Sequence, residues 1–223
     1  MAGRCGFYGK LPAVGDFVKK GLPAGFIHAV DDWLSQGLAV SRDRLGAGWT
    51  EVYLTSPIWR FVCDGGFLGD APIAGVLIPS TDKVGRYFPM IVAAALEAEA
   101  NPLDLMTASW FFDAAEDAAL FCLEDGADLA AFEAKALAVT APSAAPPVLE
   151  KSIAGGRAFA APGARDPSAA ALIALAEAGL AGIATPRGCL WTRGSDRVDE
   201  TFLTLSGPPA PTLFAGLLDG TWN

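Results

Sequence analysis

The sequence has few of the features that mark a secreted, membrane-spanning or metal-binding protein. It holds one histidine in 223 residues, and its four cysteines form no C-x-x-C pair. Scattered cysteines rarely make metal sites or disulfides, so we expect small, buried, reduced side chains. The longest apolar run, Phe88 to Leu96, is too short to span a bilayer, and no apolar signal-peptide segment is visible. These absences predict a cytoplasmic protein without a metal or cofactor.

Positive charge is scarce in the second part of the chain. Residues 1–91 carry nine Lys/Arg against eight Asp/Glu, a net of +1, whereas residues 92–223 carry seven against seventeen, a net of −10. From Glu97 to Glu133 there are ten acids and no base. Such a surface repels phosphate backbones, so we expect no nucleic-acid partner. The acids either keep an alanine-rich helical region soluble or meet a partner with a basic patch.

Hydrophobic periodicity predicts the order strand, helices, three strands, helices, two strands, helix. We expect strands over 5–8, 58–63, 75–78, 88–96, 189–192 and 201–205. We expect helices over 23–45, 101–126, 128–138, 166–182 and 211–218, and a short amphipathic segment over 49–54. Short connections between the central strands favour antiparallel neighbours. The prediction is therefore an α+β fold, with helices packed on a largely antiparallel sheet of about five to six strands in one domain, 1–223.

The same periodicity assigns faces to the elements. The first helix carries its apolar face on Phe26, Val30, Trp33, Leu34, Leu38 and Leu45. Strand alternation places Trp59 and Arg60 on opposite faces of the sheet. In the helix after Asn101, spacing predicts an apolar side through Leu103, Met106, Trp110, Ala114 and Phe121.

Two segments partly match motifs of nucleotide-binding or catalytic proteins. Gly3 and Gly9-Lys10 do not make a phosphate-binding loop, because the spacing is wrong and Leu11 replaces the required Ser or Thr. Ser80 and Lys83 match the S-x-x-K pair of acyl-transfer enzymes, in which the two side chains share one helical turn. Pro79 and Gly85 predict a loop instead, and the companion S-D-N and K-T-G motifs are absent. A serine hydrolase that uses Ser80 and Lys83 remains the alternative function.

Polar residues cluster in two loops beside apolar strands. One interpretation is that Asp16 and Arg86 form a partly buried pair that holds the loops together. The other is that the loops form a recognition surface, with Trp59 and Arg60 as anchors on a neighbouring strand. The two interpretations can coexist. The candidate binding residues are Asp16, Phe17, Trp59, Arg60, Ser80, Asp82, Lys83 and Arg86, and we predict no catalytic, cofactor-binding or metal-binding residue.

Several separated motifs appear in a fixed order. They are Gly6-Phe7-Tyr8-Gly9-Lys10-Leu11-Pro12, Gly15-Asp16-Phe17, Trp59-Arg60-Phe61, Gly75-Val76-Leu77, Pro79-Ser80-x-Asp82-x-Val84-Gly85-Arg86 and Phe88-Pro89. This set resembles the TagF (ImpM) family of type VI secretion accessory proteins. The resemblance is dense over the first 100 residues and diffuse over 101–223.

The resemblance implies regulation without catalysis. TagF proteins repress type VI secretion after translation, and they are linked to its forkhead-associated scaffold protein, in opposition to an activating threonine-phosphorylation pathway. The resemblance therefore suggests that this chain binds the scaffold, or a complex containing it, and holds the apparatus inactive. Some relatives carry a PP2C-type phosphatase domain, which this sequence lacks, so we assign it no dephosphorylation. Oligomeric state does not follow from the resemblance.

Overall fold

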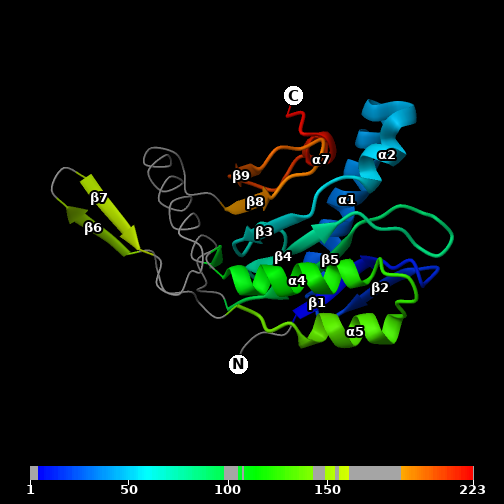
Figure 1. Ribbon diagram of the computed structural model, residues 1–223, viewed down its shortest axis with the longest axis horizontal. Coiled ribbons are helices and arrows are strands. Elements are labelled where there is room, and N and C mark those ends of the chain that lie inside the picture. Colours follow the sequence, from blue (N-terminus) through cyan, green and yellow to red (C-terminus); the bar gives the residue numbers. More distant parts are fainter. Residues whose placement is uncertain are drawn as a thin grey trace.

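A seven-stranded antiparallel sheet forms the centre of the molecule (Figure 1). The computed structural model describes residues 5–97, 105–106, 108–142, 149–153, 156–160 and 187–222. The strand order is β2-β1-β5-β4-β3-β8-β9. In that order the strands are Phe17–Lys20, Cys5–Lys10, Met90–Ala95, Ile73–Ile78, Trp59–Cys63, Gly188–Thr192 and Thr201–Leu205. A separate two-stranded ladder pairs β6 (Leu149–Ile153) with β7 (Gly156–Ala160).

Helices cover both faces of this sheet (Figure 1). One face is covered by α4 (Ser109–Phe121) and α5 (Leu129–Ala138). The other face is covered by α1 (Ala24–Leu45), α2 (Trp49–Leu54) and α7 (Pro211–Asp219), and the short η1 (Gly46–Gly48) joins α1 to α2. The sheet therefore separates two apolar cores, and β3 and β4 are buried along their whole length.

Close packing of α1 against α7 depends on a small residue. A Cβ at Gly37 of α1 would lie 2.6 Å from the Cβ of Phe214 in α7. Trp33, one turn earlier in α1, meets the Phe214 ring edge-on at 5.9 Å between centroids. The C-terminal helix is thereby held on α1, so residues far apart in sequence share one core.

The predicted α+β class is confirmed, and the sheet is slightly larger than the five to six strands expected. The additional strand is β2, in a segment for which no strand was expected. Only Val18 of its four residues is buried, so the segment carries almost no apolar alternation. The two late strands join the central sheet through β3, as predicted.

The apolar face predicted for the helix after Asn101 is wrong at Trp110. Met106 is buried, and Ala114 and Phe121 are half-buried against the core, as predicted, whereas Leu103 lies outside the described residues. The described helix, α4, begins at Ser109, and Trp110 is exposed while Phe111 and Phe112 are fully buried. Three expectations fall outside the described residues. They are the helix start at Asn101-Pro102, the helix over 166–182, and residues 143–147 of a loop expected over 141–147.

Three further observations concern the described residues alone. All four cysteines are buried and free, as expected, and burial raises the pKa of each thiol to about 12. No group of His, Cys, Asp or Glu side chains within the described ranges could hold a metal ion. None of the helices described is long and apolar enough to cross a membrane.

Candidate functional site

The two polar loops lie side by side at one end of the sheet (Figure 1). One loop joins β1 to β2, and the other, residues 79–89, joins β4 to β5. Strand pairing brings them together, because Gly9 of β1 and Ile78 of β4 both pair with Met90 of β5. Gly9 has a positive φ of 147°, and a Cβ there would lie 2.1 Å from the carbonyl oxygen of Pro89. Only glycine permits this approach of the two loops.

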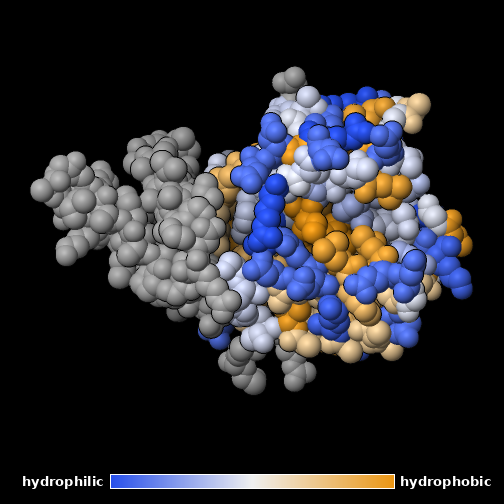
Figure 2. All heavy atoms as spheres, viewed as in Figure 1, coloured by the Kyte–Doolittle hydropathy of each residue, from blue (hydrophilic) through white to orange (hydrophobic). Residues whose placement is uncertain are grey.

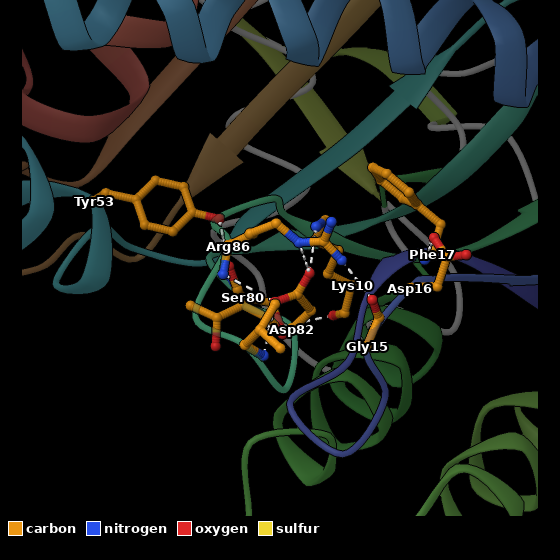
Figure 3. A network of polar contacts seen from close by, with 10 residues as sticks. Lys10, Gly15, Asp16, Phe17, Tyr53, Ser80, Asp82 and Arg86 are labelled. Carbon is orange, nitrogen blue, oxygen red and sulfur yellow. Dashed lines mark hydrogen bonds and ion pairs between the residues drawn. The ribbon is translucent and has the colours of Figure 1, made fainter.

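Asp82 is the centre of the polar contacts between the loops (Figure 3). Its Oδ2 accepts from Lys10 Nζ at 2.5 Å and from Arg86 Nε at 2.6 Å. Its Oδ1 accepts from the backbone N–H of Val84 at 3.1 Å and of Arg86 at 2.9 Å. The side chains of Asp82 and Lys10 are 0% and 6% exposed. One buried carboxylate therefore holds its own loop in shape and ties it to β1.

The surroundings of Asp82 favour its charged form. Burial by itself raises the pKa of this carboxyl, but hydrogen bonds from Lys10 and from the backbone and side chain of Arg86 outweigh burial. The pKa of Asp82 therefore lies well below its usual range. A buried lysine needs such a partner, because an unpaired ammonium in a core is costly.

Backbone groups of the two loops complete the connection. Lys83 N–H donates to the Val14 carbonyl at 3.0 Å, and the Arg86 guanidinium donates to the Gly15 carbonyl. We predicted an ion pair between Asp16 and Arg86 from the sequence, but the two side chains do not pair. Asp16 Oδ1 instead accepts from the adjacent N–H of Phe17 at 2.7 Å. Arg86 prefers Asp82, which lies four residues before it in the same tight loop.

Ser80 is a structural residue of the second loop. It is 2% exposed, and its Oγ donates to the Lys10 carbonyl at 2.8 Å. Its N–H donates to the Tyr53 hydroxyl at 3.0 Å, and that hydroxyl donates back to the Ser80 carbonyl at 2.9 Å. Lys83 is exposed. The two residues lie in a loop, as predicted, and no hydrogen bond joins Ser80 to the Lys83 ammonium in the described part of the chain.

Phe17 opens the edge strand β2 and is 42% exposed. Its ring lies 4.8 Å from that of Phe88 and is stacked on Tyr8 at 5.7 Å, and Lys10 Nζ lies 4.9 Å from its centroid. Tyr8 in turn donates a hydrogen bond to Asp31 of α1. The exposed ring is therefore held in place from beneath by aromatic contacts and a buried cation.

Trp59 and Arg60, predicted from the sequence as recognition anchors, are buried away from this surface. Trp59 is 1% exposed in the core beneath α7, where its Nε1 donates to the Leu217 carbonyl at 2.9 Å. Arg60 points to the opposite face and pairs with Asp113 at 2.7 Å and Glu116 at 2.6 Å, both on α4. The strand alternation was predicted correctly, but helices cover both residues.

Sequence reasoning missed two residues that organise the loops. Lys10 was considered only as part of a rejected phosphate loop, and Tyr53 was not considered. Lys10 ends an otherwise apolar, fully buried strand, and a lone lysine in such a position requires a buried acid. The exposed charged and large apolar residues of the two loops, which we call the loop-pair surface, are Asp16, Phe17, Lys83, Val84 and Arg86.

Comparisons with known proteins agree on one family. The TagF N-terminal domain family, type VI secretion system-associated, matches residues 6–139, which include both loops and the sheet from β1 to β5. The crystal structure of PA0076 from Pseudomonas aeruginosa PAO1 is similar along almost the whole chain. It has 37% sequence identity and a TM-score of 0.78, over 98% of this chain and 96% of that one. None of the curated proteins matches significantly.

Proposed function

This chain belongs to the TagF family of type VI secretion system-associated proteins, and on that premise we propose that it is a non-catalytic repressor of the apparatus. In this proposal it acts in the cytoplasm, after translation, by binding the forkhead-associated scaffold protein of its own secretion system or a complex containing it. Binding holds the apparatus in its inactive state. The net charge of −9 makes nucleic acid an unsuitable partner.

The loop-pair surface is the observation that carries this proposal. Phe17 and Val84 are 42% and 69% exposed, although both are apolar, and Lys83 and Arg86 place cations beside them. Exposed apolar groups next to charges are typical of protein interfaces. A partner that covers them would gain apolar burial and charge-assisted contacts.

Rigidity favours binding by these loops. The buried contacts of Asp82, Lys10 and Ser80 hold the loop backbones in one arrangement before any partner arrives. Ordered loops lose little conformational entropy when they bind, so more of the contact energy contributes to affinity. The proposal that the protein is not an enzyme rests on the same contacts, because the Ser80 hydroxyl donates its proton to the Lys10 carbonyl and makes no hydrogen bond to a basic side chain of the described residues.

The experiment is a binding measurement between the purified protein and its forkhead-associated scaffold, by calorimetry at low and high salt. We expect Lys83→Glu with Val84→Asp to weaken the complex by about tenfold or more. Neither side chain contributes to the contacts around Asp82, so the fold stays intact. The matched control is Leu54→Asp on α2, which is 51% exposed and outside the loop pair.

The outcomes separate the parts of the proposal. Weaker binding by the loop variant, with normal binding by the control, supports recognition through the loop-pair surface. Unchanged binding by both variants moves recognition elsewhere on the protein. No complex with the parent protein in any salt contradicts direct binding to the scaffold.

A further inference from the structure

Helix α4 exposes apolar side chains on the side that faces away from the sheet. Seven large hydrophobic side chains are exposed among the described residues, and three of them, Trp110, Leu120 and Leu123, belong to α4 and the turn after it. The opposite side of α4 is already filled by Phe111, Phe112 and three alanines. A helix that is apolar on two sides normally has a partner on each.

Acids lie between these apolar groups, and the described part of the chain leaves three of them unpaired. Asp113 and Glu116 bind Arg60 and Arg193 at 2.6–3.8 Å. By contrast, Asp117, Glu124 and Asp125 make no ion pair or side-chain hydrogen bond with any described residue, so their charges are not neutralised by a described basic residue. The α4 outer face, as we define it, consists of Trp110, Asp117, Leu120, Leu123, Glu124 and Asp125.

Helical spacing places three of these residues, Trp110, Asp117 and Leu120, on one side of α4, and the other three lie in the turn that follows the helix. Trp110, Asp113, Asp117 and Leu120 follow each other at steps of three, four and three, so they share one side of α4. Figure 2 views the molecule from the side of α4 and α5, and hydrophobic atoms gather near the middle of that face with hydrophilic atoms around them. Among the described residues, Trp110, Leu120 and Leu123 are each 44% exposed, and the acids Asp117, Glu124 and Asp125 are exposed as well.

From these observations we infer that the α4 outer face docks a basic amphipathic segment of a protein partner. In such a segment, leucine-like side chains would cover Trp110, Leu120 and Leu123, and Lys or Arg would meet the carboxylates of Asp117, Glu124 and Asp125. Charge complementarity selects this chemistry, because anionic membranes and nucleic acids are repelled by the same carboxylates. Where the partner is taken to be the forkhead-associated scaffold, the inference rests on the proposed function.

The test compares two triple variants with equal charge change. The α4 variant carries Asp117→Lys, Leu120→Ala and Glu124→Lys. The control carries Asp43→Lys, Leu54→Ala and Asp70→Lys, at exposed positions away from α4. Circular dichroism checks that both fold. Two probes are used, the purified scaffold and a synthetic Lys/Leu amphipathic peptide, with a Glu/Leu peptide as its negative control.

We expect the α4 variant to bind the scaffold about tenfold more weakly than the parent, and the control variant to bind normally. The loss should shrink at high salt, because part of the attraction is between charges. Equal binding of the scaffold by the parent and the α4 variant would overturn the inference and leave the proposed function standing.

A scaffold that binds neither the parent nor the variants would contradict the proposed function, and the peptide then decides the inference. If the parent and the control variant bind the Lys/Leu peptide and the α4 variant does not, the result supports docking on the α4 outer face by a basic partner other than the scaffold. Failure of all three proteins to discriminate the Lys/Leu from the Glu/Leu peptide would overturn it.

Discussion

Replacing Trp59 by alanine is expected to lower the free energy of unfolding by about 3–5 kcal/mol. The indole is 1% exposed, and its Nε1 hydrogen bond to Leu217 connects β3 to α7. Alanine leaves a cavity between the sheet and α7 and removes the partner of a buried carbonyl. Denaturant unfolding followed by circular dichroism measures the loss.

Trp110→Ala is the matched control for this substitution. Trp110 is 44% exposed, so we expect its removal to cost less than about 1 kcal/mol. A Trp59→Ala protein that unfolds at the same denaturant concentration as the parent, but no longer binds the scaffold, would restore Trp59 as a recognition anchor and contradict its place in the core.

Replacing Lys10 by alanine is expected to lower the free energy of unfolding by about 3 kcal/mol, because it leaves a buried carboxylate without one of its two cations. Arg86 and two backbone N–H groups still donate hydrogen bonds to Asp82 in this variant. The loss should therefore lie at the lower end of the range measured when one partner of a buried ion pair is removed. Asp82→Ala should cost more, since the Lys10 ammonium then has no acid beside it. Denaturant unfolding of the single and double variants measures both losses, and additive losses would show that the pair is not coupled.

Acid titration gives a second readout of the same pair. Asp82 has a pKa in the folded protein below its unfolded value of about 3.9. Its stabilising contribution is therefore fully present above that value and is lost as the pH falls through the folded pKa. We expect the free energy of unfolding of Asp82→Asn to decrease less than that of the parent as the pH falls below about 4. Asp43→Asn, at an exposed position of α1, should follow the parent. An unchanged profile in Asp82→Asn would contradict the charged, paired state of this carboxylate.

Elements with strong periodicity could be predicted from sequence, because one residue pattern settles both their type and their face. Five of the six residues predicted for the apolar side of α1 are buried, and the sixth, Leu45, is half-buried at the end of the helix. The segments expected over 58–63, 189–192 and 201–205 are strands within one residue at each end. β2 was missed because an edge strand with one buried residue has no pattern to detect.

What covers each face could not be predicted. Alternation correctly separated Trp59 from Arg60, but it does not state that α7 and α4 lie over them. Sequence spacing likewise favoured Trp110 for the buried side of its helix, whereas Phe111 and Phe112 fill that side. With apolar residues on nearly every side of α4, tertiary packing decides which of them is buried.

The loop contacts were only partly predictable. The two loops and most of their polar residues were identified, but the Asp16–Arg86 pair was wrong and the Lys10–Asp82 pair was missed. Lys10 and Asp82 are 72 residues apart in sequence, and only the pairing of β1 and β4 with β5 brings them together. Several acids could serve each base, and burial rather than sequence distance decides between them.

Type VI secretion in cells that lack this protein is the most direct measurement of its proposed role as a repressor. Secreted substrates of the system would be quantified in culture medium after complementation with the parent protein or with the Lys83→Glu, Val84→Asp variant at equal abundance. We expect secretion to rise when the protein is absent, to fall again with the parent, and to stay high with the variant. Equal secretion with and without the protein would contradict its role as a repressor.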